Sequence, residues 1–301
     1  LIILNWFAAR EWHPRRHQLE MLDAARAGEH ALLVAPTGAG KTLAGFLATL
    51  ADLVEQPMDG LHTLYISPLK ALAVDVRRNL LKPIEEMDLD IRVETRTGDT
   101  PSDRKARQRA KPPHILLTTP ESLSLLLSYP DSFQMFAGLK RIVIDEIHAF
   151  ATTKRGDLLN LSLSRLQAIA PQMRRAALSA TVADPDEYRV WLAPSGGDVR
   201  LVEGDPGAPP DLAILLPEDR VPWAGHSGAY ATPQVMAEIE THQTTIVFCN
   251  TRGLCELIFQ ELWNANELKL PIGIHHGSLD IEARRKVEEA IYALGMEIAY
   301  T

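Results

Sequence analysis

Residues Ala35–Thr42 read APTGAGKT and directly follow a short apolar run, Ala31–Val34. The segment after them has the apolar spacing of a helix. Gly38 and Gly40 let the backbone curl between strand and helix, so that successive N–H groups point inward and the helix adds its positive end. A plain corner would not need Gly-Lys-Thr. The stretch therefore predicts a phosphate-binding loop, with Ala instead of the usual Gly in the first position.

Similar apolar, β-rich runs recur along the chain, and helical periodicity separates each from the next. They are Ala31–Val34, Thr63–Ile66, Ile91–Thr95, Ile115–Thr118, Arg141–Ile144 and Ala176–Leu178. Strands that alternate with helices form βαβ units with a parallel sheet. Several of the runs are continuously apolar, as expected when helices cover both faces. The sequence predicts an α/β domain.

Length and composition limit the remaining options. The 301 residues favour two domains on the usual size of about 150 residues. A formal charge of -8 and 46% hydrophobic residues are typical of a globular protein and argue against a histone-like binder. No apolar run approaches the roughly 18 residues of a membrane span, and neither end resembles a signal peptide. Two cysteines exclude a four-thiolate metal site and favour a reducing, cytoplasmic location.

Glycine and proline become dense after Gly204, which indicates a connector. We therefore predict a first domain over residues 1–203, a connector over 204–232 and the N-terminal part of a second domain over 233–301. The connector is expected to hold one strand, Leu212–Leu216. Beyond it the sequence predicts the strands Thr245–Cys249 and Ile272–His275 and the helix Leu254–Asn264.

Two acidic residues follow the apolar run Arg141–Ile144. Asp145 and Glu146 would lie at the carboxyl end of a strand, where ligands bind in open α/β sheets. Asp145 would then hold Mg²⁺, and Glu146 would orient and deprotonate an attacking water. An exposed strand end is the alternative. His148 by itself is more typical of a structural residue.

Ser179 and Thr181 follow another apolar strand, and taken alone they favour a helix N-cap. The order of the phosphate loop, Asp-Glu-Ile-His and Ser-Ala-Thr resembles the superfamily 2 DExH-box helicases. Further segments resemble that family's motifs at their expected places: Gln18, Ser67–Leu72, Thr97–Thr100, Thr118–Ser122, Val247–Arg252 and His275–Leu279. The residues of several motifs, and residues 221–226 in the connector, resemble the large helicase-related (Lhr) group, in particular its ligase-associated DEXH-box branch.

The resemblance implies tandem RecA-like domains of the P-loop NTPase class and an ATP-driven motor. It implies 3′-to-5′ movement on single-stranded or partly duplex DNA, a role in bacterial DNA repair and partners such as a ligase or nuclease. ATP would be held by Gln18, Thr37, Gly38, Ala39, Gly40, Lys41 and Thr42, and Mg²⁺ by Thr42 and Asp145. Lys41, Asp145, Glu146 and His148 would be catalytic, and Ser179 and Thr181 would couple the ATP site to the nucleic-acid strand.

The nucleic-acid contacts implied by the resemblance are Ser67, Pro68, Lys70, Thr97, Gly98, Asp99, Thr119, Pro120, Asn250, Thr251, Arg252, His276, Gly277 and Ser278. The physics of the first-domain motifs agrees, since Ser or Thr with Pro or Gly at a strand end exposes N–H groups and hydroxyls to a sugar–phosphate backbone. Thr118 and Glu121 also match a capping box, and Pro120 suits a first helical turn.

Two other segments have competing interpretations. The run Arg104–Lys111 holds five cations in eight residues and could attract nucleic acid, but a solvated helix face is favoured. Trp223, His226 and Tyr230 could stack on bases or pack between domains.

Complete relatives continue past the His-Gly-Ser region to motifs that supply arginines to the γ-phosphate, and no such segment is present here. We therefore expect a C-terminally incomplete chain that binds ATP weakly and hydrolyses it poorly. The alternatives are a non-hydrolysing nucleic-acid-binding module and a helicase acting on RNA or RNA–DNA hybrids.

Overall fold

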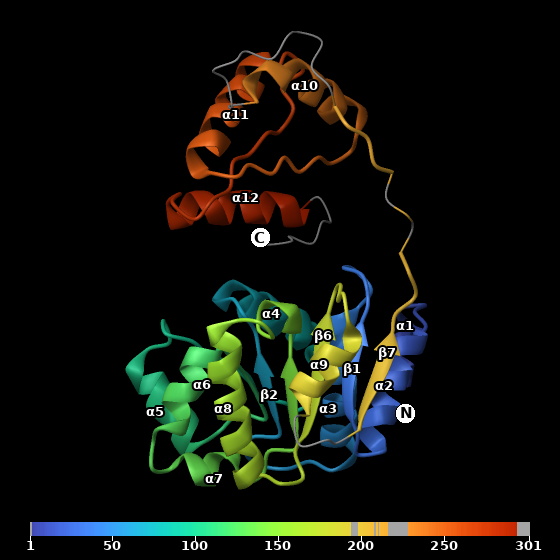
Figure 1. Ribbon diagram of the computed structural model, residues 1–301, viewed down its shortest axis with the longest axis vertical. Coiled ribbons are helices and arrows are strands. Elements are labelled where there is room, and N and C mark those ends of the chain that lie inside the picture. The colour runs from blue at the N-terminus through green and yellow to red at the C-terminus, as the bar shows by residue number, and fades with distance from the viewer. Residues whose placement is uncertain (1, 194–197, 208, 210, 216–227, 294–301) are drawn as a thin grey trace. The chain divides into compact units, whose positions relative to one another are not determined.

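The computed structural model describes residues 2–193, 198–207, 209, 211–215 and 228–293. The chain forms two compact units, Leu1–Pro209 and Pro210–Thr301. Figure 1 shows both units.

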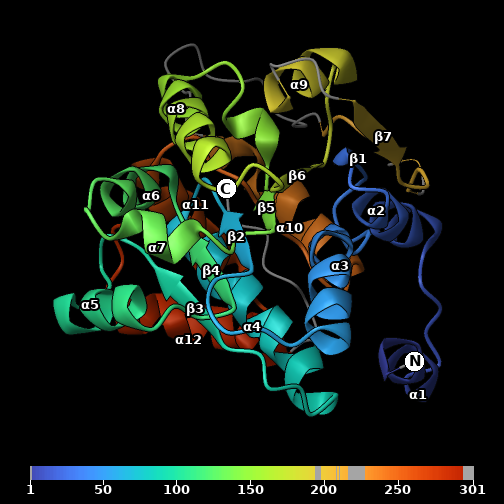
Figure 2. The ribbon, with the colours of Figure 1, turned by 90° about the horizontal axis from the view of Figure 1, so that it is seen from below.

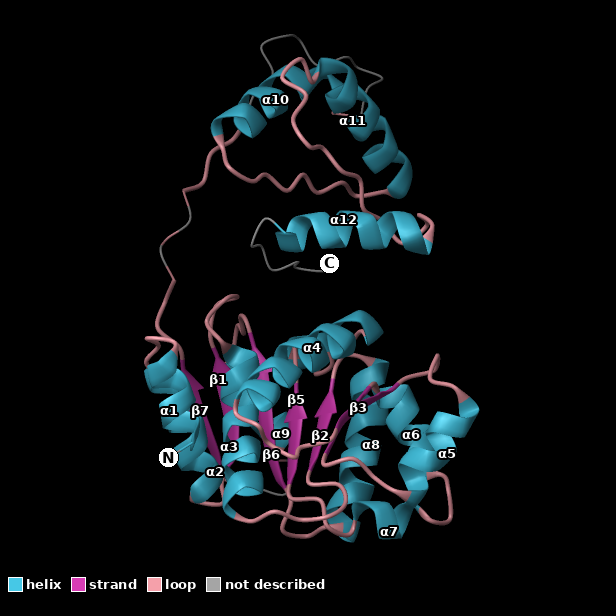
Figure 3. Cartoon of the chain, turned by 180° about the vertical axis from the view of Figure 1, so that it is seen from behind, coloured by secondary structure: helices cyan, strands magenta, loops and turns pink. Residues whose placement is uncertain are grey.

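The first unit is built on one parallel sheet in which strands and helices alternate (Figure 3). Its strands are β1 (His30–Val34), β2 (Thr63–Ile66), β3 (Val93–Arg96), β4 (Ile115–Thr118), β5 (Arg141–Ile144), β6 (Arg174–Ser179) and β7 (Val199–Glu203). Its helices are α1 (Ile2–Ala9), α2 (Arg16–Arg26), α3 (Lys41–Glu55), α4 (Lys70–Glu86), α5 (Ser102–Ala110), α6 (Pro120–Leu127), α7 (Ser132–Phe136), the short η1 (Ile147–Ala149), α8 (Lys154–Ile169) and α9 (Pro185–Leu192).

The strand order is β3-β4-β2-β5-β6-β1-β7, and every neighbouring pair is parallel. The predicted α/β class with a parallel sheet is therefore confirmed. The six predicted strands are all present, and β7 is a seventh that the sequence analysis did not find. Strand β3 begins at Val93, two residues later than predicted, because the Arg92 amide donates to Nδ1 of His114 at 3.0 Å.

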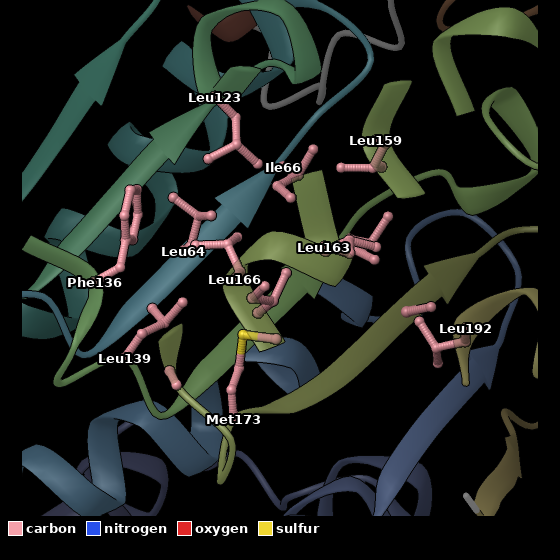
Figure 4. Close-up of a cluster of buried hydrophobic side chains, with 14 of the residues drawn as sticks. Leu64, Ile66, Leu123, Phe136, Leu139, Leu159, Leu163, Leu166, Met173 and Leu192 are labelled. Atoms are coloured by element: carbon pink, nitrogen blue, oxygen red, sulfur yellow. The ribbon is translucent and has the colours of Figure 1, made fainter. Parts of the chain in front are cut away.

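Helices cover both faces of this sheet (Figure 2). One core packs side chains of α2, α3 and α4 against the sheet, and it includes Phe46 and Tyr65. The other packs α6, α7, α8 and α9 against the opposite face, with Leu163 and Phe136 fully buried (Figure 4). The continuous apolar strands β2, β4 and β5 are buried at every position, which is what a sheet covered on both faces requires.

The second unit is helical in its described residues. It holds η2 (Ala229–Ala231), α10 (Thr232–Thr241), α11 (Arg252–Ala265) and α12 (Ile281–Ala293). Helix α11 confirms the helix predicted over Leu254–Asn264.

The strands predicted outside the first unit are wrong in the described residues. Thr245–Cys249, Ile272–His275 and residues 212–215 have no strand assignment, and Leu216 lies outside the described residues. A strand is held by hydrogen bonds to a neighbouring strand, and these segments have no such partner in the described chain. Ile246 and Phe248 accordingly remain more than half exposed.

Candidate nucleotide and nucleic-acid site

The loop between β1 and α3 has the backbone that the glycines predict. Gly38 and Gly40 both have φ of +76°, in the left-handed region, and Gly40 caps the N-terminus of α3. A residue with a side chain is strained in this conformation. A Cβ on Gly40 would also lie 2.8 Å from Nε2 of Gln18. The turn therefore requires glycine at position 40, and a Cβ there would displace the Gln18 amide from the loop.

Three side chains at the start of α2 bind three successive carbonyls of this loop. Arg15 Nη1 donates to Gly38 O at 3.2 Å, and Gln18 Nε2 donates to Gly40 O at 3.3 Å. Between them, His17 Nε2 lies 2.9 Å from Ala39 O. Of these three residues only Gln18 was predicted from the sequence, although Arg15 and His17 lie in the same run before it.

Lys41 begins α3, and its ammonium group lies over the start of the loop. Nζ donates to Ala35 O at 2.9 Å and to Pro36 O at 3.1 Å. Burial lowers the pKa of Lys41, and the carboxylates of Glu146 and Asp145 act in the opposite direction. The loop and the two acidic residues thus share one electrostatic environment.

Asp145 follows β5 and is almost completely buried. The Tyr65 hydroxyl donates to its Oδ2, and the Glu146 amide donates to its Oδ1 at 3.0 Å. Burial raises the pKa of Asp145 to about 6, against the opposing effect of the Tyr65 hydrogen bond. Tyr65 is a site residue that the sequence analysis missed, because its apolar strand gives no sign of which hydroxyl faces the site.

Glu146 has φ of +49°, a left-handed conformation uncommon for a residue with a side chain. Its Oε2 is buried without a hydrogen bond in the described residues and lies 3.4 Å from Nδ1 of His148. A buried, unpartnered carboxylate oxygen is available to a ligand. Oxygen ligands suit Mg²⁺, and the Asp145 carboxylate and the Thr42 hydroxyl are groups of that kind.

His148 is joined to the end of β6. Its Nδ1 lies 2.9 Å from Ser179 Oγ, and Ser179 Oγ donates to Thr181 O at 3.1 Å. The N-cap interpretation of Ser179 and Thr181 is wrong, because α9 begins at Pro185 and Asp184 accepts the capping bond from Asp186. Ser179 is instead fully buried at the strand end, where its hydroxyl bridges two loops.

The first-domain segments proposed to contact nucleic acid follow β2, β3 and β4, which are neighbours in the sheet. Lys70 Nζ lies 2.9 Å from both carboxylate oxygens of Asp99, so the loops after β2 and β3 are joined. Gly98 lies in the same contact, since a Cβ there would be 3.4 Å from Lys70 Nζ. These three strand ends form one edge of the unit.

Hydroxyls at this edge bond to their own loops. Ser67 Oγ donates to Leu69 O at 3.0 Å, and Thr100 Oγ1 accepts from the Thr97 amide at 3.0 Å.

The predicted capping box at Thr118 is wrong by one residue. Thr119 is the N-cap, accepting from the Ser122 amide with Pro120 in the first turn, while Thr118 Oγ1 donates to Arg96 O at 2.8 Å.

The basic run forms α5 and is partly neutralised by acidic neighbours. Arg104 and Arg107 both pair with Glu94, and Arg109 pairs with Asp131. The solvated helix face is thus the interpretation that these contacts favour. Of the connector aromatics, Trp223 and His226 lie outside the described residues, and Tyr230 lies in η2.

In the second unit the two predicted segments come together. Arg252 Nη1 donates to Ser278 Oγ, and a Cβ on Gly277 would lie 3.8 Å from Arg252 Nη2. Thr251 caps α11 by accepting from the Leu254 amide at 3.2 Å, and Asn250 directly precedes it. His276 Nε2 lies 3.3 Å from Glu256 Oε1.

Comparison with known proteins agrees with this arrangement. Residues 15–188 match the DEAD/DEAH box helicase family, which is more than half of the chain. The chain belongs to this family. It is 36% identical over 94% of its length to the ATP-dependent helicase Lhr-Core of Methanocaldococcus jannaschii, of which it covers 36%. It is 34% identical over 95% of its length to the Lhr helicase/probable uracil glycosylase of Mycolicibacterium smegmatis, of which it covers 22%.

Two solved structures are also similar to this helicase chain. Helicase Lhr of Mycobacterium smegmatis, bound to ssDNA and AMP-PNP, has a TM-score of 0.82 at 34% identity, over 98% of this chain and 40% of that one. The DUF1998 helicase MrfA, bound to DNA and AMPPNP, has a TM-score of 0.80 at 25% identity, over 96% of this chain and 42% of that one. The first unit thus has the RecA-like fold of helicases. The chain spans well under half the length of these relatives. In its described residues, no helix is long and apolar enough to cross a membrane.

Proposed function

We propose that this chain is the motor part of an ATP-dependent helicase that moves 3′ to 5′ along single-stranded DNA in the service of DNA repair. One observation carries the proposal. The carboxyl ends of the neighbouring strands β5, β6 and β1 bear Glu146, Ser179 and the loop with Lys41. The ends of β3, β4 and β2, on the other half of the same sheet, bear the segments assigned to DNA.

Each residue near the loop has a defined chemical task in this proposal. The loop amides and Lys41 bind the nucleotide phosphates, and Glu146 orients the attacking water and accepts its proton. Mg²⁺, held by Thr42 and Asp145, would neutralise charge on the phosphates. The buried Oε2 of Glu146, which has no hydrogen bond in the described residues, supports the assignment of Glu146 as the base.

The link from His148 through Ser179 to Thr181 supports coupling between hydrolysis and strand binding. It joins the loop that carries Glu146 to the strand next to the phosphate loop. The similarity to DNA-bound relatives supports DNA as the strand. DNA repair, polarity and repair partners such as a ligase or nuclease follow from the resemblance alone, and a cytoplasmic location follows from the two cysteines of the sequence.

The test measures ATP binding, ATP hydrolysis with and without single-stranded DNA, and unwinding of matched DNA, RNA and hybrid duplexes that carry a 3′ or a 5′ overhang. We expect a longer protein that continues through the arginine-bearing motifs to bind DNA with a 3′ overhang and unwind it, and residues 1–301 alone to bind ATP weakly and hydrolyse it slowly. In the longer protein, Glu146→Gln should keep ATP affinity and reduce turnover at least about 100-fold. Glu187→Gln, an exposed position on α9, is the matched control.

Different outcomes would remove different parts of the proposal. Retained hydrolysis in Glu146→Gln would remove Glu146 from the base role. Equal activity on all three duplexes would defeat the DNA assignment, and ATP binding without any strand-stimulated hydrolysis in the longer protein would favour a non-hydrolysing binding module.

A further inference from the structure

His17 is a buried side chain in direct contact with the phosphate loop. It lies in the first turn of α2 and is 1% exposed. Its Nε2 lies 2.9 Å from Ala39 O. Because a carbonyl can only accept, Nε2 carries the proton and donates. The other ring nitrogen, Nδ1, is buried and has no hydrogen-bond partner in the described residues.

This contact is the shortest and most buried of the three between α2 and the loop. The bonds of Arg15 to Gly38 O and of Gln18 to Gly40 O are 3.2 and 3.3 Å long, and the first of them is exposed. Water therefore competes least for the carbonyl of Ala39. Gly204 lies beside the other ring nitrogen, since a Cβ added there would be 3.6 Å from Nδ1.

The direction of the Ala39 carbonyl fixes the direction of the next amide. In a planar trans peptide the C=O of one residue and the N–H of the next point in opposite directions. With Ala39 O held against α2 by His17, the Gly40 N–H faces away from α2. Gly40 is the left-handed residue after which α3 begins, so this peptide sets how the loop enters the helix.

We infer that His17 is a positioning residue for the phosphate site, which holds the Ala39–Gly40 peptide so that the Gly40 N–H faces the nucleotide phosphates. The inference deepens the proposed function and rests on it, because it takes a nucleotide as the ligand of this loop. His17 acts through the peptide and touches no reacting atom. A hydrogen bond of this kind changes an equilibrium by a factor of about 3 to 10.

The experiment compares affinities for ATP and GTP in the unmodified chain, His17→Leu and His17→Gln, measured by calorimetry well below each melting temperature. His17→Leu keeps similar bulk without the donor, and we expect both affinities to fall about 3- to 10-fold, by the same factor. His17→Gln carries an amide N–H at nearly the position of Nε2, and its affinities should stay within about twofold of the unmodified chain. Gln18→Ala is the comparison variant. The resemblance implies that Gln18 reads the adenine base, so this change should alter the ratio of the ATP and GTP affinities.

The opposite results are equally specific. Unchanged affinity in His17→Leu, or an equal loss in His17→Gln, would show that His17 only fills space. Thermal melts separate that case, because packing alone lowers the melting temperature without changing affinity. If His17→Leu does not fold, His17→Asn, whose amide is one methylene shorter than that of Gln, provides the same comparison. An unmodified chain that binds neither nucleotide would defeat the proposed function as well, whereas normal binding with an insensitive position 17 would defeat this inference alone.

Discussion

Nδ1 of His148 lies 2.9 Å from Oγ of Ser179, across the boundary between the loop after β5 and the end of β6. Ser179 Oγ in turn donates to Thr181 O. Since the hydroxyl proton is directed at Thr181, the ring nitrogen of His148 is the donor to Ser179. Three residues from two separate motifs thus form one directed chain of hydrogen bonds.

Because the two side chains share one hydrogen bond, their substitutions should not be additive. We expect a coupling free energy of about 0.5–1.5 kcal/mol between His148→Ala and Ser179→Ala in a double-mutant cycle of unfolding by denaturant. His148→Ala combined with Ser128→Ala is the control, since the Ser128 hydroxyl donates to Leu125 O. Additive effects for His148 and Ser179 would contradict the bond.

His30, at the start of β1, should make stability depend on pH. Burial, together with the nearby Arg175 and Arg174, lowers the pKa of His30 to about 4. The unfolded chain therefore binds a proton between about pH 6.5 and pH 4 that the folded chain does not, so stability falls as the pH is lowered through this window. The expected contribution is about 1–3 kcal/mol, discounted for partial exposure.

His30→Asn is the variant that checks this. Its side-chain oxygen can accept the bond that the Arg175 amide now donates to Nδ1 at 3.0 Å, and it does not titrate. Chemical unfolding at pH 7 and pH 4.5 should show a smaller difference for the variant. An equal difference in both proteins would assign the pH dependence to other groups.

The Lys70–Asp99 ion pair should limit strand affinity. The Lys70 ammonium donates to both carboxylate oxygens of Asp99, although both side chains are exposed. Asp99→Asn should raise affinity for single-stranded DNA about 2- to 5-fold at low salt, and Lys70→Ala should lower it and reduce the salt slope by about 0.7. Fluorescence anisotropy across a salt series measures both quantities.

Asp103→Asn, an exposed change in the first turn of α5, is the control for charge alone. An equal gain there would mean that net charge, and not release of Lys70, explains the result. Loss of affinity in Asp99→Asn would instead identify Asp99 as a direct contact.

Gly204 should tolerate no side chain. A Cβ there would lie 2.4 Å from the Cβ of Ala35 and 3.1 Å from its Cα. Gly204→Ala should lower the free energy of unfolding by about 1–3 kcal/mol. Gly207→Ala is the matched control, since its Cβ would meet Pro36 at an ordinary 3.8 Å. Similar denaturation midpoints for both variants would contradict the close contact.

The strands of the first unit could be predicted from sequence because a strand that is buried on both faces can be recognised from its own residues. Strands covered on both faces are continuously apolar, and β2, β4 and β5 begin and end at the predicted residues. Strand β7 was missed because it mixes buried Val199 and Val202 with partly exposed Arg200 and Leu201 and ends in a glutamate, as an edge strand can.

Local sequence was less informative where the structure depends on distant partners. Thr245–Cys249 has the composition of a strand, but a strand forms only with a neighbour. The roles of Tyr65 and His17 in the site depend on which atom each side chain meets across the fold. Spacing along the chain contains no such information, whereas the phosphate loop, whose glycines act locally, was correctly assigned its turn.

The contact between Gly204 and Ala35 determines where this protein can be divided. The Gly204 amide extends the β7 ladder by donating to Val34 O at 2.8 Å, and Arg16 binds Glu203 O and the Asp205 carboxylate. Composition alone would end the first domain at Glu203. A polypeptide that stops there loses Gly204 and Gly207, which lie beside Ala35 and Pro36 of the phosphate loop. Expression of the nucleotide-binding unit by itself, or its fusion to another protein, should therefore retain the chain through Gly207 and place the junction after it.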